Sequence, residues 1–298
     1  MPNTRPNLIS KIPKEIVRKA DALLEALPYL QAFRGKTFVI KYGGSALGEA
    51  AKRKGILQDI VFLSVAGIRP VLVHGGGPEI SKQMSRKGAR PRFVQGLRVT
   101  DAATLQTVVS ALTRVNRLLV KELRALGARA QGLLGSEGGF IGAEPVQIPG
   151  EDLGFAGTVT SVNTGPVQRL LSLGVIPVVI PVGADWNHQL YNINADAAAS
   201  SLAAALKAEK FVLVTDVPGI LLNQKAGTGL LPTVTVARAK QLIQKGTIVG
   251  GMIPKTMACI HALQGAVGKT HMININVPHG LLLEIFTDKG IGTEILNR

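Results

Sequence analysis

Short apolar runs alternate with longer stretches of helical period along most of the chain. The runs are rich in β-branched residues and end near glycine, which predicts buried strands. The clearest strands are residues 37–42, 69–74, 175–182, 211–217 and 271–277. Between them, apolar positions with helical spacing predict helices over residues 52–66, 79–87, 102–126, 166–173, 195–206 and 237–245. Strands that alternate with helices indicate a parallel sheet covered by helices.

Two segments break this alternation. Residues 92–101 and 139–148 combine short turns with mixed polarity, which favours hairpins placed on the sheet. No linker rich in proline, glycine or serine divides the chain. We therefore expect one continuous domain whose two lobes share a sheet.

The segment before the first strand carries an apolar stripe of its own. Residues 14–33 place Ile16, Leu23 and Leu27 on one face of a helix, although Pro28 should kink or end its first part. Such a stripe needs a partner. Both packing on its own domain and contact with another subunit are consistent with the pattern.

The composition limits the classes of protein to which the chain can belong. With 46% hydrophobic residues in a chain of 298, there is ample material for a large core. The sequence shows neither an apolar run long enough for a membrane span nor a secretory signal, so we expect a soluble cytoplasmic protein. The single cysteine, Cys259, cannot form an internal disulfide, and a packed helix residue is a better interpretation than a catalytic thiol.

A formal net charge of +15 raises the question of a nucleic-acid partner. The basic residues are scattered, however, and aromatic residues that could stack on bases make up only 4% of the chain. We therefore expect no nucleic-acid partner and no membrane partner. The basic surface suits solubility or anionic ligands.

Glycine turns follow two of the predicted strands at points where a helix begins. Lys41 ends one strand and is followed by Gly43 and Gly44, and the next strand is followed by residues 75–77 and then by Pro78. Free N–H groups at such turns suit an anion, and strand ends of this kind hold ligands in open α/β sheets. Close packing alone would also explain the first turn. Neither turn fits the dinucleotide spacing G-x-G-x-x-G.

Polar residues gather at two further helix starts. Asn192 and Asn194 share a face of an extended segment, and Asp196 lies near the start of an alanine-rich helix, where it is either a helix-dipole partner or part of a site. Lys255 follows two glycines at the start of another helix. A lysine there opposes the helix dipole, so an anion should compensate it.

In this order and spacing, the motifs resemble the amino-acid kinase family, and most closely its N-acetyl-L-glutamate kinases. The resemblance covers residues 27 to 294. It is carried by the stretches KYGGSA, VLVHGGGPEI, GLRVTD, DLGFAG, YNINAD, LVTDVPGIL, GGMIPK and LLLEIFTDKGIGT. It implies a three-layer αβα sandwich with a largely parallel central sheet. The substrate lobe would span about residues 34–185 and the nucleotide lobe about residues 186–298 of a single domain, 34–298.

The resemblance also implies roles for single residues. Lys41 and Lys255 would stabilise the transferring phosphoryl group, and Asp196 would organise them. The acylated amino acid would be held by Gly76, Gly77, Arg98, Asn192 and Asn194. ATP would be held by Gly43, Gly44, Thr215, Asp216, Gly219 and Gly251.

Chemistry supports these roles independently. A carboxylate nucleophile is already ionised at neutral pH, so no general base is needed. Both reactants are anions, and positioned cations and N–H groups must offset their repulsion. Arg98 can grip a substrate carboxylate with two hydrogen bonds. We expect Mg²⁺ to be held mainly through the ATP phosphates, with no dedicated metal ligands from the protein.

The resemblance further implies regulation. Arginine-inhibited members have an extra N-terminal helix, here residues 1–33, that links dimers into a hexamer. Their L-arginine site matches His271, Glu284 and Gly290. A PII-type signalling protein docks on some relatives and is a candidate partner. The chain departs from the usual pattern at residues 132–138 and at 274–276, which read GLLGSEG and NIN.

The expected activity is thus the phosphorylation of N-acetyl-L-glutamate by ATP in arginine biosynthesis. Two alternatives stay open. One is a kinase for another amino-acid carboxylate, such as carrier-linked α-aminoadipate. The other is a catalytically inactive arginine-sensing module, against which the presence of both lysines and Asp196 argues.

Overall fold

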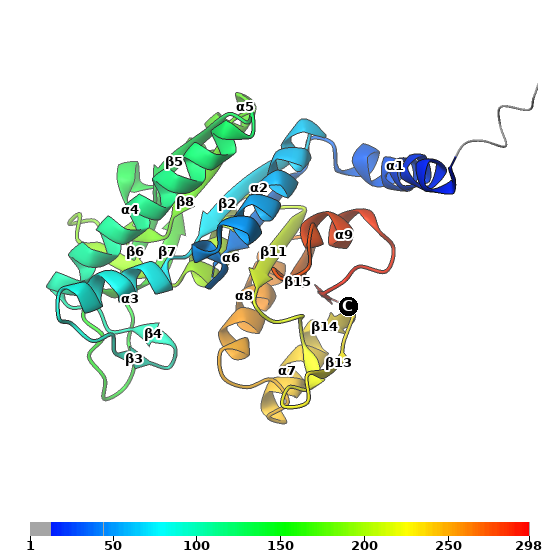
Figure 1. Ribbon diagram of the computed structural model, residues 1–298. Helices are drawn as coiled ribbons and strands as arrows, with labels where there is room; N and C mark the ends of the chain where they lie inside the picture. The colour runs from blue at the N-terminus through cyan, green and yellow to red at the C-terminus, as the bar shows by residue number, and fades with distance from the viewer. Residues whose placement is uncertain (1–12, 44, 298) are drawn as a thin grey trace, which may run out of the picture.

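The computed structural model describes residues 13–43 and 45–297. Most of the strands that the sequence predicts join one eight-stranded sheet (Figure 1). The sheet order is β14-β16-β15-β11-β1-β2-β8-β5. Its strands are β1 (Thr37–Tyr42), β2 (Arg69–His74), β5 (Ala130–Leu134), β8 (Ile176–Ile180), β11 (Lys210–Thr215), β14 (Thr233–Thr235), β15 (Lys269–Asn274) and β16 (Thr293–Leu296). All neighbours run parallel except β15 and β16. The prediction of a largely parallel central sheet is confirmed.

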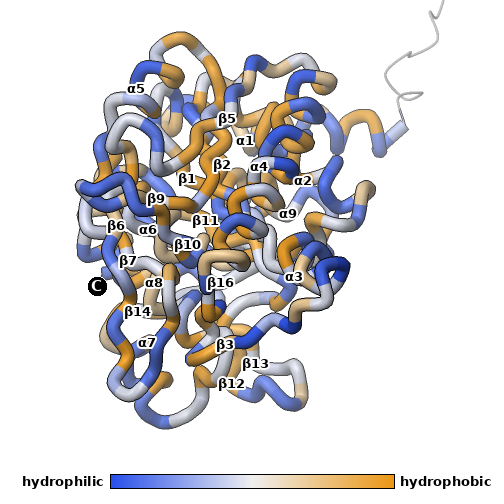
Figure 2. Tube along the Cα trace, turned by 90° about the vertical axis from the view of Figure 1, so that its left-hand side faces the viewer, coloured by the Kyte–Doolittle hydropathy of each residue, from blue (hydrophilic) through white to orange (hydrophobic). Residues whose placement is uncertain are grey.

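Helices cover both faces of this sheet. On one face, a core under α2 (Ala50–Val65), α4 (Ala102–Ala125) and α9 (Gly280–Phe286) includes Phe38 and Ile40 of β1. On the other face, Val39 packs beneath α5 (Gly165–Ser172), α6 (Ala195–Ala205), α7 (Val236–Gln244) and α8 (Met252–Gln264). The central strands are the most hydrophobic part of the trace (Figure 2). This arrangement is the predicted αβα sandwich.

The alternation along β1 decides where the candidate lysine points. Successive side chains of a strand face opposite sides of the sheet. Because Val39 faces α6 and α8, Lys41 faces them as well, whereas Ile40 and Tyr42 face α2. The pattern of β1 therefore directs the Lys41 side chain to the helices that carry Asp196 and Lys255.

A smaller closed group of four strands lies beside the main sheet. It comprises β6 (Ile141–Pro145), β7 (Ala156–Val162), β9 (Val182–Ala184) and β10 (Leu190–Ile193). The predicted strand 175–182 is split between β8 and β9 at Pro181, which has no N–H for a strand ladder. The predicted hairpin at 139–148 is instead one strand, β6, that pairs antiparallel with β7.

Shorter elements complete the fold. The hairpin expected at residues 92–101 is present, with β3 (Phe93–Val94) antiparallel to β4 (Leu97–Arg98). Another hairpin joins β12 (Leu221–Asn223) and β13 (Thr228–Leu230). The remaining elements are α3 (Gly77–Arg86), which packs on α4, and the short helices η2 (Ser45–Gly48) and η3 (Glu137–Gly139).

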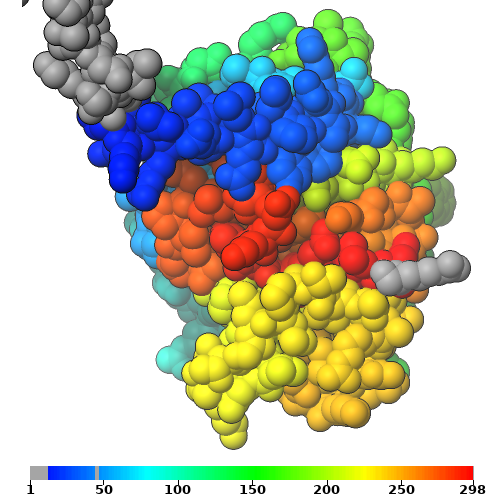
Figure 3. Space-filling view, turned by 90° about the vertical axis from the view of Figure 1, so that its right-hand side faces the viewer, coloured from blue at the N-terminus to red at the C-terminus, as the bar shows by residue number. Residues whose placement is uncertain are grey.

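The first helix, α1 (Lys14–Phe33), continues through Pro28 rather than ending there. Its last turns place Tyr29, Leu30 and Phe33 against the main core, and it lies across α9 (Figure 3). No residue of α1 is buried, and Leu23 and Leu24 are 70% and 66% exposed. The predicted stripe is thus covered only near its C-terminal end. Residues 1–12 of the predicted extension lie outside the described residues.

Among the helices of the described residues, none combines the length and the apolar character needed to cross a membrane.

Candidate active site

One carboxylate between two ammonium groups forms the centre of the site. Lys41 Nζ lies 2.7 Å from Asp196 Oδ1, and Lys255 Nζ donates a hydrogen bond of 3.0 Å to Asp196 Oδ2. The three side chains come from β1, α6 and α8, so they are far apart along the chain and meet only because α6 and α8 pack together over the sheet. The structure therefore brings together the three predicted catalytic residues.

The charge of Asp196 is secured by its neighbours. Burial by itself would raise the pKa of this carboxyl group, but the two lysine ammonium groups outweigh it and hold the pKa below its ordinary value. Asp196 is ionised at neutral pH. Together the three groups carry a net positive charge that can face an anion.

Both glycine turns lie at the same edge of the sheet, beside this cluster. Strands β1 and β2 are parallel neighbours with Lys41 level with Val73, so their carboxyl ends coincide. The Gly75 N–H donates to the Tyr42 carbonyl over 2.8 Å, which ties the second turn to the end of β1. A Cβ at Gly43 would meet Lys41 Nζ at 2.5 Å, so any other residue there would require the lysine ammonium group to move.

A pocket of about 230 Å³ opens next to the cluster. Its lining includes Lys41, Asp196 and Arg98. The predicted substrate residues Gly76, Gly77, Asn192 and Asn194 also line it. The structure thus brings all of the predicted substrate residues to one cavity. Two cationic side chains, Lys41 and Arg98, line that cavity, which suits a ligand with two carboxylates.

Arg98 is held in place before any ligand binds. Its guanidinium donates to the Gly77 carbonyl (3.2 Å) and to Ser81 Oγ (2.9 Å), and it stands 4.7 Å from the centre of the Phe93 ring. Burial lowers the pKa of Arg98 from its high ordinary value. The sequence interpretation missed Ser81 and Phe93. For Ser81 the only local signal is its position one helical turn beyond Gly77.

The two asparagines differ in what they do. Asn194 is the N-cap of α6, since its Oδ1 accepts from the N–H groups of Asp196 and Ala197 at 2.8 and 3.2 Å. It therefore orients the first turn that carries Asp196. Asn192 Nδ2 donates to Thr100 Oγ1 over 3.1 Å, a partner that the sequence interpretation did not identify.

Apart from the glycines after β1, the predicted nucleotide residues lie between the last residue of β11 and the start of α8. Thr215 ends β11, two positions beyond the residue that pairs with Lys41, and donates to the side chain of Asp216. Gly219, with φ +145°, packs so closely on Thr293 that a side chain would meet its Oγ1 at 2.4 Å, which gives this glycine a packing role. Gly251 is the N-cap of α8 and borders open space. Gly44 lies outside the described residues.

The residues matched to an effector site are also adjacent to one another. His271 Nδ1 and Glu284 Oε1 are 2.8 Å apart, and Gly290 (φ +58°) lies against the Glu284 carboxylate. They line a cavity of about 380 Å³ next to Tyr29 and Phe33 of α1. Burial lowers the pKa of Lys210, which contacts His271 Nε2, to about 8.

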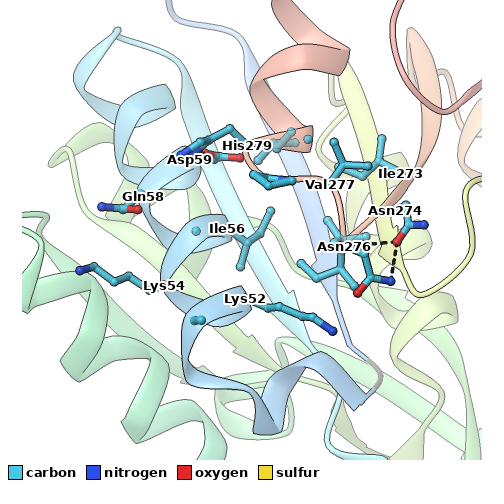
Figure 4. A pocket seen from close by; sticks show the side chains of 17 residues that line it. Lys52, Lys54, Ile56, Gln58, Asp59, Ile273, Asn274, Asn276, Val277 and His279 are labelled. Atoms are coloured by element: carbon cyan, nitrogen blue, oxygen red, sulfur yellow. Dashed lines mark hydrogen bonds and ion pairs between the residues drawn. The ribbon is translucent and has the colours of Figure 1, made fainter.

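A further cavity of about 450 Å³ lies between α2 and the connection from β15 to α9 (Figure 4). Asn274 and Asn276, part of the departure at 274–276, line it and bond to each other. Neither lines the cavity of His271 and Glu284. The departure therefore lies outside the residues matched to the effector site.

The chemistry of the site does not include a protein cage for a metal. Among the described residues, no group of three or more histidine, cysteine, aspartate or glutamate side chains is arranged to hold an ion. The carboxylate at the centre, Asp196, is already shared by two lysines.

Comparison with protein families gives a match over most of the chain. The model of the amino acid kinase family matches residues 36–274. The chain is 44% identical over 282 residues to the acetylglutamate kinase of Syntrophomonas wolfei, covering 94% of this chain and 98% of that one. It is 48% identical over 275 residues to the acetylglutamate kinase of Synechococcus elongatus, covering 92% and 91% of the two chains.

Solved structures of similar fold extend the comparison. N-acetylglutamate synthase from Neisseria gonorrhoeae, complexed with coenzyme A and N-acetyl-glutamate, superposes with a TM-score of 0.84 at 28% identity, over 94% of this chain and 63% of that one. This chain thus spans less than two thirds of the synthase. The same synthase complexed with coenzyme A and L-arginine gives a TM-score of 0.81 at 27% identity, over 94% and 65% of the two chains.

Proposed function

The chain belongs to the amino acid kinase family, and from that premise we propose that it transfers the γ-phosphoryl group of ATP to the side-chain carboxylate of N-acetyl-L-glutamate. The product is N-acetyl-L-glutamyl 5-phosphate, and the step belongs to arginine biosynthesis. The observation that carries the proposal is the Lys41, Asp196 and Lys255 cluster beside a pocket that Arg98 also lines.

In this proposal, Arg98 and Lys41 bind different carboxylates of the substrate. Arg98 binds the α-carboxylate of the substrate through guanidinium N–H groups that its protein partners leave available. The side-chain carboxylate then lies near Lys41, which lines the same cavity. Asn192 hydrogen-bonds the bound amino acid, and N–H groups of the turn at Gly76 and Gly77 face its anionic group.

The chemical step needs positioning and charge rather than proton transfer. The ionised carboxylate attacks the γ-phosphorus in line, and the bond to the β,γ-bridging oxygen breaks, leaving ADP. Lys41 and Lys255 offset the negative charge shared by the two reactants, while Asp196 keeps the ammonium groups apart and aligned. The nucleotide is held by Gly43, Gly44, Thr215, Asp216, Gly219 and Gly251. Mg²⁺ carried by the phosphates neutralises part of their charge.

A trapping assay tests the reaction directly. Hydroxylamine converts an acyl phosphate into a hydroxamate that can be measured, and N-acetylglutamate, free glutamate and α-aminoadipate are compared as acceptors. We expect a signal that depends on ATP and is strongest with N-acetylglutamate. The Lys255→Ala variant should lose about 100-fold or more of kcat, as expected when one stabilising group of a transition state is removed.

The arms of this assay separate the alternatives. Activity on glutamate or α-aminoadipate alone would contradict the assignment of the substrate. No activity on any acceptor in a folded protein would favour the inactive sensing module. Full activity of Lys255→Ala would contradict the role of the lysine pair.

Arginine feedback is a second, finer part of the proposal. The cavity lined by His271, Glu284 and Gly290 carries a buried carboxylate that suits a guanidinium or amino group. The similar synthase from Neisseria gonorrhoeae has been crystallised with L-arginine. We expect arginine at millimolar concentration to inhibit the wild type.

A matched pair of variants tests the effector site. Glu284→Gln should abolish arginine inhibition with an unchanged rate in the absence of arginine, whereas the control Glu144→Gln, at an exposed position of β6, should remain inhibited. Rates that do not respond to arginine in a hexameric wild type would refute the feedback.

The assembly and its setting complete the proposal. Residues 1–33 would link dimers into a hexamer, since Ile16, Leu23 and Leu24 of α1 are exposed in the single chain. A PII-type signalling protein is a candidate partner of that hexamer. The use of ATP favours a cytoplasmic location.

A further inference from the structure

A buried histidine stands directly behind the glycine turn of the substrate pocket. His74 ends β2, is 0% exposed and does not line the pocket. Its Nδ1 lies 2.9 Å from the carbonyl oxygen of Gly75, and its Nε2 lies 3.1 Å from Asn116 Nδ2 of α4. Asn116 Nδ2 also donates to the Val178 carbonyl over 2.8 Å.

These contacts assign a single protonation state. A carbonyl oxygen only accepts hydrogen bonds, so His74 Nδ1 carries the proton. Nε2 then accepts from Asn116, whose second amide hydrogen goes to Val178. The reversed amide would set two oxygens against each other at Val178. Burial lowers the pKa of His74 to about 4, which agrees with a neutral ring.

The hydrogen bond from His74 to the Gly75 carbonyl also sets the direction of the Gly76 N–H. In a trans peptide the C=O and the following N–H point in opposite directions. With the Gly75 carbonyl turned toward the imidazole in the core, the Gly76 N–H is turned away from that ring, and Gly76 is one of the residues that line the pocket. Within the part of the chain that the structure describes, no protein acceptor pairs with this N–H.

The turn would not hold this orientation by itself. Glycine adopts both signs of φ readily, so the peptide between Gly75 and Gly76 can rotate at little steric cost. A rotated peptide would point a carbonyl oxygen at the bound anion. A stiffer residue in place of Gly76 would require Leu112 to shift, because a Cβ there would meet Leu112 Cδ2 at 2.5 Å.

We propose that His74, held by Asn116, is a positioning residue that fixes the peptide between Gly75 and Gly76, so that the Gly76 N–H faces the carboxylate of the substrate. The inference rests on the proposed function for the identity of that substrate. His74 acts through the glycine turn and not on the reacting atoms.

Side-chain amides can separate the two nitrogens of the ring. Asparagine places an N–H donor near the position of Nδ1, whereas glutamine reaches the position of Nε2 and the contact with Asn116. His74→Asn should keep KM for N-acetylglutamate within about 3-fold, and His74→Gln and His74→Leu should raise it about 10- to 100-fold, the range for a lost hydrogen bond to a charged group. KM for ATP should stay unchanged in all three.

Two results would overturn the proposal. One is an unchanged KM for the acceptor in folded His74→Gln. The other is an equal rise for the asparagine and glutamine variants that follows their loss of thermal stability, which would make His74 a packing residue only.

A measurement on the wild type keeps the proposal testable even where variants fail to fold. The ¹³C and ¹⁵N chemical shifts of the His74 ring distinguish its tautomers, and the form with hydrogen on Nδ1 is expected. The form with hydrogen on Nε2 would refute the proposed hydrogen bond from His74 Nδ1 to the Gly75 carbonyl. If the trapping assay shows another carboxylate as the acceptor, KM for that acceptor is compared among the His74 variants instead. Failure of the substrate assignment is therefore distinct from failure of the positioning role of His74.

Discussion

At the scale of single residues, the buried charge of Asp196 links activity to stability. Its pKa is lower in the folded protein than in the unfolded chain, so the ionised carboxylate stabilises the fold above about pH 4, the ordinary range of an aspartate. This stability is lost as the pH falls through the lowered pKa. The ion pair of Asp196 and Lys41 is buried, so water cannot solvate either charge if its partner is removed.

We therefore predict that Asp196→Asn lowers the free energy of unfolding at pH 7 by about 3 kcal/mol or more, because two lysine charges lose their buried partner. Denaturant titrations at pH 7 and near pH 3 measure this difference, which should shrink at the lower pH. The control Glu151→Gln removes a surface pair with Arg92 and should cost less than about 1 kcal/mol. A difference for Asp196→Asn that does not depend on pH would contradict the coupling.

Arg98 carries the second prediction at this scale. Lysine keeps the positive charge but lacks the planar fork that binds a carboxylate with two hydrogen bonds. Arg98→Lys should raise KM for N-acetylglutamate about 10- to 100-fold and leave KM for ATP unchanged. Steady-state kinetics with each substrate varied in turn would show this. Arg92→Lys, at an exposed position nearby, is the control and should behave as the wild type.

At the scale of elements, helix α9 depends on a residue from another helix. His279, the N-cap of α9, makes no capping bond of its own. Instead Asp59 of α2, 1% exposed, accepts from the backbone N–H groups of Leu281 and Leu282 and from His279 Nδ1 (Figure 4). Burial outweighs these contacts and raises the pKa of Asp59. An acceptor oxygen is thus needed there more than a full charge.

We predict that Asp59→Ala destabilises the protein by about 1 to 2 kcal/mol, as loss of a helix cap does, and lowers Tm in a thermal melt. Asp59→Asn keeps an acceptor oxygen and should lose clearly less. Equal losses for the two variants would show that the charge, not the cap, matters. Neither variant should change kcat, because the cap is remote from the Lys41 cluster.

At the scale of the whole molecule, the exposed face of α1 is the feature that a single chain leaves unexplained. Leu23 and Leu24 are mostly exposed, and only the last turns of the helix pack on the core. Under the proposed hexamer this face would pack between dimers. Burying several such side chains would stabilise the contact by about 1.5 to 3 kcal/mol each.

The double variant Leu23→Lys/Leu24→Lys should therefore reduce the mass measured by light scattering from that of a hexamer to that of a dimer. It should keep kcat, since α1 lies outside the catalytic pocket. Val65→Lys, at an apolar position of α2 that is 83% exposed, is the control and should remain hexameric. A hexamer that withstands the double change would place the contact elsewhere.

The sequence alone determined the features that depend on neighbours along the chain. The apolar runs of β1 and β2 match the predicted residues 37–42 and 69–74, because a strand buried on both faces must be apolar throughout. The glycine turns after these strands were visible for the same reason, since backbone freedom is a local property. The order of the motifs also sufficed to indicate the family.

Tertiary structure alone decided which side chains meet. Lys41, Asp196 and Lys255 were singled out in sequence, but their contact requires the sheet order and the packing of α6 on α8. Ser81, a support of Arg98, has no sequence signal beyond its position one helical turn after Gly77, and the pair of His74 and Asn116 has none, because each contact joins segments that come together only in the folded chain. Local propensity cannot encode such contacts. They follow from the way distant elements share one buried volume.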